Sequence, residues 1–418
     1  KTSKQTMFAF VGTIFIYLFL FIFYVFKFIC YVILILLLLL WKHQGAILYQ
    51  RHAPSRKRQL AYNPFPRVRT PGYYKFDFDD FFVTTKDNVL IHCWLIRQQN
   101  STECPTIICF HGNAGNIGYR LPNAYYMYRE LHSNIIMVDY RGYGNSEGVP
   151  TQKGLIYDAE SILKHLLERN DINLNKVYLF GRSLGGAVAI DLAYRCCAGK
   201  LTTLDNDKVI VSDKKININD MNSNSASAGG TENNTSLNVS DDELTRLNNT
   251  HSDEDKKIVI AGLIIENTFT SILDMVFVII GEFLKSRQSN DNSQNSDVEM
   301  DDDGSNEIFN QSTKMGRFLK YLRVFLRYFI TNGWYSDKKV KEIVLPSLYL
   351  SGLSDELIPP KQMKKLFSFA SKKSVLPVMQ TFDEGDHNST WQRAGQKYWD
   401  DIVAFITTTS SMADQITT

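Results

Sequence analysis

The sequence predicts an α/β fold, with a mostly parallel central sheet, helices on both faces, and one transmembrane helix in front of it. Three observations predict it. Short apolar runs alternate with helical patterns over most of the chain, as parallel sheets require. A glycine-flanked turn separates one such run from a helix, and a long apolar stretch lies near the start of the sequence. The chain has 418 residues, enough for one domain of roughly 250–300 residues plus additions.

Residues 7–41 are almost wholly apolar and aromatic, broken by Lys27 and a few small residues. A bilayer core of about 30 Å needs only about 20 helical residues, so one span fits. A signal peptide is the alternative, but its apolar region would be about 7–15 residues long. We therefore predict a membrane anchor over residues 7–41. Basic residues follow it and predict a cytosolic domain: Lys42, Arg51, Arg56, Lys57 and Arg58.

Beyond the anchor we predict one domain over residues 60–412, interrupted by two polar tracts. Residues 202–257 and 286–314 are rich in polar or acidic side chains and hold too few apolar ones to bury a core. Both are predicted to be disordered insertions. The net charge of +2 gives no indication of a nucleic-acid partner.

Regular elements are expected between these tracts. The runs 76–84 and 89–97 flank Lys86-Asp87-Asn88 and predict a β-hairpin. Five further runs read as buried strands: 106–110, 135–138, 177–180, 258–265 and 346–350. Helical patterns are found at 119–131, 152–168, 187–194, 318–330 and 394–406.

The strand ending at Phe180 leads into Gly181-Arg182-Ser183-Leu184-Gly185-Gly186 and then a helix rich in small residues. This is a G-x-S-x-G turn between a strand and a helix, the setting of a nucleophile elbow. Glycines at 181 and 185 are expected to clear space for the turn, and Ser183 is the candidate nucleophile. The alternative is a tight turn with an idle serine.

A serine nucleophile needs a base, and the chain has eight histidines. In this type of site the order along the chain is Ser, acid, His. His387 follows an apolar run and is the only histidine that lies after the elbow and outside the polar tracts. Asp355 follows the strand 346–350 and is the candidate acid, with Glu356 beside it as the alternative. Its expected task is to orient the imidazole.

An oxyanion needs main-chain N–H donors. The strand 106–110 leads into His111-Gly112-Asn113-Ala114-Gly115-Asn116, a glycine-rich loop. The N–H groups of Asn113 and Leu184 are the predicted donors. We expect a structural role for His111, and likewise for Arg141 as an ion-pairing residue.

Six segments together resemble one family: HGNAGN at 111–116, DYRGYGNSEG at 139–148, GRSLGG at 181–186, ENTFTSI at 266–272, SGLSDELIPP at 351–360 and GDH at 385–387. They are similar to the branch of the α/β-hydrolase superfamily that holds α/β-hydrolase domain-containing protein 13 and the yeast bud-emergence relatives. The resemblance covers about residues 63–406 and implies the α/β-hydrolase fold. It also implies Ser183, Asp355 and His387 as a catalytic triad. It further implies a single-pass signal-anchor with a lumenal or extracellular domain, which conflicts with the charge count.

The expected activity is hydrolysis of a carboxylic ester or thioester through an acyl-enzyme. The anchor favours a lipid or an acylated protein as substrate. A serine peptidase of related fold and a non-catalytic scaffold are the alternatives. No metal or organic cofactor is expected, and the sequence gives no oligomeric state.

Overall fold

The computed structural model describes residues 2–54, 57–211, 256–291 and 314–417. The chain divides into two compact units. One unit consists of Lys1–Leu48 and Glu299–Asn332, and the other of Tyr49–Val298 and Gly333–Thr418. Each unit is described by itself.

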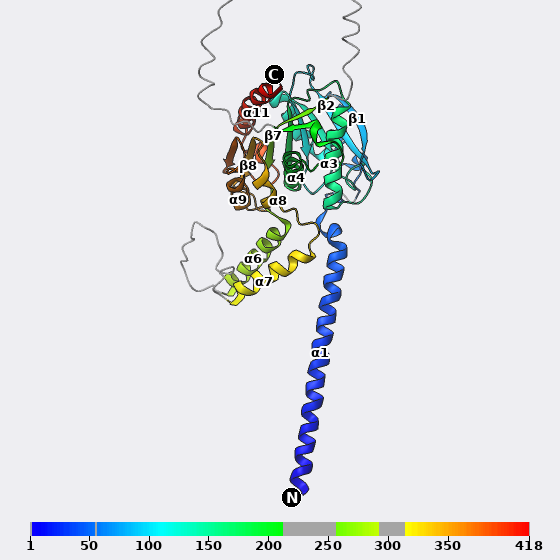
Figure 1. The fold of residues 1–418 in the computed structure, drawn as a ribbon, viewed down its shortest axis with the longest axis vertical. Helices are drawn as coiled ribbons and strands as arrows, with labels where there is room; N and C mark the ends of the chain where they lie inside the picture. Colours follow the sequence, from blue (N-terminus) through cyan, green and yellow to red (C-terminus); the bar gives the residue numbers. More distant parts are fainter. Residues whose placement is uncertain (1, 55–56, 212–255, 292–313, 418) are drawn as a thin grey trace, which may run out of the picture. The chain divides into compact units, whose positions relative to one another are not determined.

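The second unit is built on one sheet, with nine strands in its described part (Figure 1). Eight strands follow the order β1-β2-β4-β3-β5-β7-β8-β9, and β6 pairs with β7. The pairs β1–β2 and β2–β4 are antiparallel, and all other pairs are parallel. The strands are β1 (Asp77–Thr84), β2 (Leu90–Arg97), β3 (Thr106–Phe110), β4 (Asn134–Val138), β5 (Val177–Arg182), β6 (Val209–Val211), β7 (Ile258–Glu266), β8 (Ser347–Gly352) and β9 (Pro377–Phe382).

The predicted hairpin is confirmed, with Thr84 opposite Leu90 in the β1–β2 ladder. Its turn closes through the Thr85 N–H, which donates to the Val89 carbonyl at 3.0 Å. The central strands β4, β5 and β7 are buried along their whole length. Such strands can be apolar throughout because helices cover both faces of the sheet.

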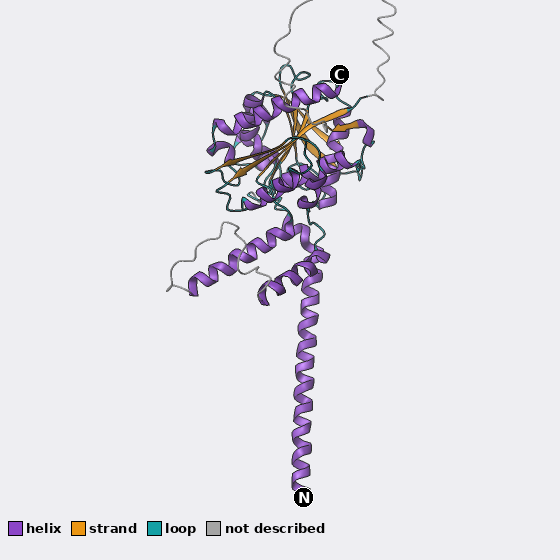
Figure 2. Ribbon diagram, turned by 60° about the vertical axis from the view of Figure 1, so that its left-hand side comes forward, coloured by secondary structure: helices purple, strands orange, loops and turns teal. Residues whose placement is uncertain are grey.

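Helices lie on both faces of the sheet (Figure 2). The helices of this unit are α2 (Leu121–Leu131), α3 (Gln152–Leu167), α4 (Leu184–Ala198), α6 (Ile272–Asp291), α8 (Ser336–Lys339), α9 (Lys361–Ala370), α10 (Thr390–Arg393) and α11 (Gln396–Thr417), and α6 does not belong to the layers that cover the sheet (Figure 1). Short 3-10 turns are found at Leu60–Tyr62, Pro66–Val68, Pro71–Tyr74, Ile117–Arg120, Asn206–Lys208 and Val340–Glu342.

The two faces of the sheet bury different side chains, because successive residues of a strand point to opposite sides. Ile107 and Met137 belong to one buried cluster with Tyr398 and Trp399 of α11, and α2 packs against α11 in the same layer. The pair α3 and α4 pack against each other, and α4 contacts β3, β5, β6 and β7. Burial of these apolar side chains stabilises the sheet by about 25 cal/mol per Å².

The first unit contains α1 (Thr2–Leu48, blue in Figure 1) and α7 (Lys314–Phe329). Within α1, Gly12–Leu48 is long and apolar enough to cross a membrane. The helix extends past the predicted anchor, 7–41, at both ends. Gln44 near its end contacts the last residue of α7 and the chain after it. The Thr331 N–H donates to Gln44 Oε1 at 2.9 Å, and Gln44 Nε2 donates to the Phe329 carbonyl.

The prediction of disorder was wrong at the edges of both polar tracts. Within 202–257, residues 206–208 form a 3-10 turn and 209–211 form β6, which pairs in parallel with the buried strand β7. Within 286–314, residues 286–291 belong to α6 and residue 314 begins α7. Residues 212–255 and 292–313 of these tracts lie outside the described residues.

Candidate active site

Ser183 lies between the last residue of β5 and the first residue of α4, at φ 55° and ψ −121°. Few residues other than glycine adopt such a conformation, which stores strain of about 1–3 kcal/mol. A Cβ at Gly181 would lie 2.2 Å from the Gly185 carbonyl oxygen, and one at Gly185 would lie 1.9 Å from the Phe110 oxygen. Both glycines are therefore needed for the turn, as the sequence predicts.

Three side chains that are far apart in the sequence meet at this turn. His387 Nε2 lies 3.0 Å from Ser183 Oγ, and His387 Nδ1 lies 2.8 Å from Asp355 Oδ2. Ser183 is 7% exposed, and the side chains of His387 and Asp355 are 11% and 1% exposed. A hydroxyl, an imidazole and a buried carboxylate in this order are equipped to pass a proton from the hydroxyl to the ring.

Asp355 is fixed by its own loop. Its second oxygen, Oδ1, accepts hydrogen bonds from the N–H groups of Leu357 and Ile358 at 2.9 and 2.8 Å. Hydrogen bonds to a carboxylate are strong and hold it in one orientation. Glu356, the alternative acid, is exposed to solvent. The structure thus brings Asp355, and not Glu356, to His387.

The segment after β7 supports the site. Residues 266–272 were named as a family segment, but no role at the site was predicted for them. The Ser183 N–H donates to the Glu266 carbonyl at 3.0 Å, and Thr268 Oγ1 donates to the Ser183 carbonyl at 2.7 Å. The side chain of Asn267 between them bonds to the main chain of Gly352 and Asp386. Only its position at the end of a buried strand, in line with the elbow, signals this role in the sequence.

A buried ion pair lies beneath the elbow. Nε and Nη2 of Arg182 donate to Glu266 Oε2 at 2.8 and 2.7 Å, and the Tyr398 hydroxyl donates to the same oxygen at 2.9 Å. Arg182 Nη1 lies 3.4 Å from the carbonyl of Asn388, the residue after His387. Removing one partner of such a pair leaves an uncompensated buried charge, which is costly.

The predicted oxyanion loop lies against the elbow. A Cβ built on Gly112 would be 3.5 Å from the Ser183 Cβ, so the two backbones are close. Asn113 follows, and its Oδ1 accepts from the Tyr143 hydroxyl at 2.8 Å and from the Gln50 N–H at 3.1 Å. Leu184 is the first residue of α4. The main-chain N–H groups at the start of a helix have no partner within the helix and can donate to a negatively charged oxygen.

His111 and Arg141 have structural contacts, as predicted. His111 Nδ1 lies 2.7 Å from the Gly112 carbonyl, and burial lowers the pKa of His111 to about 4. The ring is therefore neutral at physiological pH. Arg141 pairs with Asp158 at 2.8 Å and with Asp87 at 2.7 Å, which joins the hairpin to α3.

Among the described residues, no group of three or more His, Cys, Asp or Glu side chains is placed to hold a metal ion. All six cysteines lie among the described residues, and none of them forms a disulfide there.

The strand order and the strained serine turn between β5 and α4 define the α/β-hydrolase fold class. The family model described as "alpha/beta hydrolase fold" matches residues 105–195. The solved Pyrococcus furiosus esterase Pf2001 is similar at a TM-score of 0.49 and 15% identity, covering 81% of this chain and 93% of its own.

The curated relatives are similar over most of their length. Alpha/beta hydrolase domain-containing protein WAV2 of Arabidopsis thaliana is 31% identical, over 81% of this chain and 81% of its own. Protein bem46 of Schizosaccharomyces pombe is 27% identical, over 88% and 87%. The membrane protein YNL320W of Saccharomyces cerevisiae is 26% identical, over 88% and 90%. The chain belongs to the family of alpha/beta hydrolase domain-containing proteins. Membership of the branch that holds α/β-hydrolase domain-containing protein 13 stays a prediction.

Proposed function

We propose that this protein is a membrane-anchored serine hydrolase that cleaves a carboxylic ester or thioester. The observation that carries the proposal is the hydrogen-bonded series Ser183–His387–Asp355, with both contacts at 3.0 Å or less. Ser183 is the nucleophile, His387 the general base and acid, and Asp355 the residue that orients the ring.

In the first half-reaction His387 Nε2 takes the proton of the Ser183 hydroxyl while Oγ attacks the carbonyl carbon. The carbonyl electron pair moves to oxygen, and the N–H groups of Asn113 and Leu184 stabilise that oxyanion. The intermediate collapses and expels the alcohol or thiol, which receives the proton from His387. An acyl-serine remains.

In the second half-reaction water attacks the acyl-serine. His387 accepts a proton from this water, and the new intermediate collapses to release the carboxylic acid. His387 then returns the proton to Ser183 Oγ, so the enzyme is regenerated. The carboxylate of Asp355 stabilises the imidazolium in both halves.

The first unit supports a lipid or acylated-protein substrate. The sequence of helix α7 has five basic residues and no acidic one: Lys314, Arg317, Lys320, Arg323 and Arg327. Aromatic residues recur on it every three or four positions, and Phe318, Tyr321, Phe325 and Tyr328 are exposed. A basic helix with an aromatic face suits an anionic membrane surface. Together with the apolar helix α1, helix α7 favours a substrate that is held in the bilayer.

A substrate panel tests the proposal. Purified full-length protein is assayed with a p-nitrophenyl ester series of increasing acyl length, an acyl thioester and a peptide p-nitroanilide. We expect turnover of esters or thioesters, loss of at least about 10³-fold in Ser183→Ala, and unchanged rates in the exposed-serine control Ser368→Ala. Preferred cleavage of the anilide would indicate a peptidase. Equal rates in wild type and Ser183→Ala would indicate a non-catalytic scaffold.

A further inference from the structure

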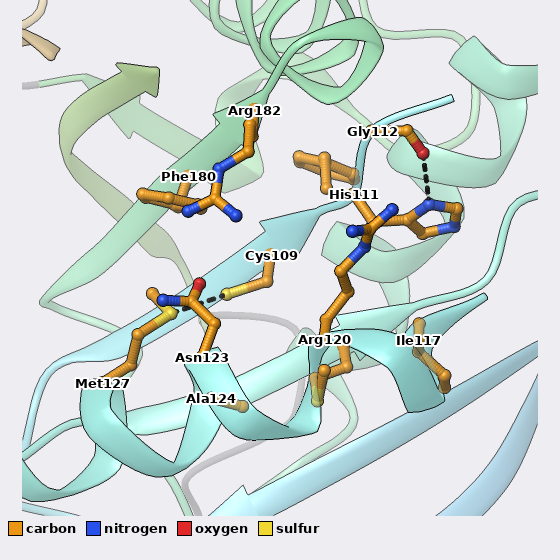
Figure 3. Close-up of a pocket in the computed structure, with 12 residues that line it drawn as sticks. Cys109, His111, Gly112, Ile117, Arg120, Asn123, Ala124, Met127, Phe180 and Arg182 are labelled. Carbon is orange, nitrogen blue, oxygen red and sulfur yellow. Dashed lines mark hydrogen bonds between the residues drawn. The ribbon is translucent and has the colours of Figure 1, made fainter. Parts of the chain in front are cut away.

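A small cavity of about 30 Å³ lies behind the oxyanion loop, between α2 and the sheet (Figure 3). Gly112 lines it, but Ser183, His387 and Asp355 do not. Most of its wall is apolar, from Cys109, Phe110, Ile117, Ala124, Met127, Met137 and Phe180. The cavity therefore adjoins the oxyanion loop without including the three candidate catalytic side chains.

Two buried hydrogen-bond donors belong to the polar part of this wall. Nε of Arg120 and Nδ2 of Asn123 are buried and have no hydrogen-bond partner among the described residues. Asn123 as a whole is 8% exposed. Arg120 is the N-cap of α2, and Asn123 lies three positions later, so both side chains are on one face of the first helical turn. The positive end of the helix dipole lies at the same place.

The cavity also has a cationic character. Arg120 and Arg182 enter it from different elements (Figure 3). Arg182 is paired with Glu266, but its Nη1 has only a long contact of 3.4 Å to the Asn388 carbonyl. Burial, and next the charge of Arg182, lower the pKa of Arg120 to about 10, so Arg120 keeps its charge at neutral pH. The buried carboxylate of Asp139 acts in the opposite direction and raises the pKa of Arg120.

His111 does not supply a donor to this space. If its Nδ1–H donates to the Gly112 carbonyl at 2.7 Å, its Nε2 has a lone pair, and the low pKa keeps the ring neutral. Nε2 lies 3.5 Å from Asp139 Oδ1. The donors that face the cavity are thus the two guanidinium groups and the amide.

We propose that this cavity binds a small monovalent anion of about the size of chloride, held by Arg120, Asn123 and Arg182. A single water needs about 10–15 Å³, so the space of about 30 Å³ suffices for a halide, and its small size favours a halide over a bulkier oxyanion. The anion would offset the repulsion between the two guanidinium groups. Because Arg120 Nη2 also donates to the Ala114 carbonyl at 2.5 Å, the same anion would fix the loop that contains Asn113.

Thermal unfolding of the full-length protein in nanodiscs tests this site without reference to catalysis. Sodium chloride is exchanged for sodium gluconate at constant ionic strength. We expect chloride at about ten times its dissociation constant to raise Tm by about 2–4 °C. Asn123→Asp supplies a carboxylate of its own, so the chloride response should disappear. The control Asn175→Asp, on an exposed loop, should keep the full response.

Bromide diffraction supplies the second measurement, on the unmodified protein. An anomalous peak between Arg120 and Asn123 is expected in crystals grown with sodium bromide. An ordered water at that place with no bromide signal would overturn the proposal. An equal chloride response in the parent protein and Asn123→Asp would overturn it too. If Asn123→Asp fails to fold, the bromide experiment decides alone.

Discussion

The side-chain amide of Asn267 donates a 2.8 Å hydrogen bond to the main-chain carbonyl of Asp386, the residue before His387. The oxygen of the same amide accepts from the Gly352 N–H at 2.8 Å, at the end of the strand that leads to Asp355. One buried side chain therefore joins the loop of the base to the strand of the acid. Asn267 has φ 46°, a conformation that asparagine tolerates better than most residues.

Substituting Asn267 should lower kcat without changing KM, since it positions His387 and does not touch substrate. Asn267→Asp keeps the acceptor for Gly352 but replaces the donor to Asp386 with a repulsive oxygen. We expect a fall in kcat of about 10–100-fold. Steady-state kinetics with a soluble ester measures it, and the pH profile of kcat should shift as well. Wild-type kcat in a folded Asn267→Asp protein would show that the bridge has no positioning role.

Gly185→Ala should abolish the elbow. The added methyl group would lie 1.9 Å from the Phe110 carbonyl oxygen, so the turn or β3 must move. We expect loss of serine reactivity and a fall in Tm of more than about 5 °C. Gly72→Ala is the matched control, because its nearest neighbour would be at an ordinary 3.5 Å. Equal Tm values for the two variants would contradict the steric argument.

The buried, neutral ring of His111 should make the folded protein less stable at acidic pH. Its pKa is about 4 in the folded state, below the ordinary value of 6.5. Below pH 6.5 the unfolded chain binds the proton first, so stability is lost as pH falls through this range toward 4. The contribution is on the order of 3 kcal/mol. Removing this titration in His111→Asn should flatten the fall in Tm between pH 7 and 4.5. The comparison variant is His132→Asn, which removes an exposed histidine at a helix C-cap.

Much of the site was predictable because its chemistry is local in sequence. The elbow needs two glycines at fixed spacing around Ser183, and chain order then left one histidine and a short acidic loop. The roles of Asn267 and Thr268 were not predicted because they arise from contacts with residues 85 or more positions away in the sequence. No local pattern distinguishes such residues from a polar strand end.

The fold, like the site, was predictable where its signal is local in the sequence. Short apolar runs predicted most of the strands, but no strand was predicted at β9. Strand β6 has only three residues beside a polar tract and is recognisable only from its pairing with β7. The helices α6 and α9 were not predicted. Helix α6 ends inside a tract that was predicted to be disordered because it is polar. Helix α9 follows two prolines, and polar and apolar residues are interspersed in its sequence.

Two exposed tyrosines of α7 should matter only for substrates held in a bilayer. Tyr321 and Tyr328 are 73% and 83% exposed. We expect the double variant Tyr321→Ser, Tyr328→Ser to keep its Tm and its rate on a soluble short-chain ester. Its rate on a long-chain ester in anionic vesicles should fall about three- to tenfold. Tyr62→Ser, at 51% exposure in the second unit, is the control. Equal losses on both substrates would refute a role at the membrane surface.

The central claim is that Ser183 is a nucleophile activated by His387. Its most direct test is labelling of the full-length protein with a fluorophosphonate, followed by peptide mass spectrometry. We expect one adduct, on the Ser183 peptide, absent in Ser183→Ala and slowed at least about 100-fold in His387→Ala. An adduct that persists in Ser183→Ala, or a His387→Ala protein that labels at the wild-type rate, would contradict the account.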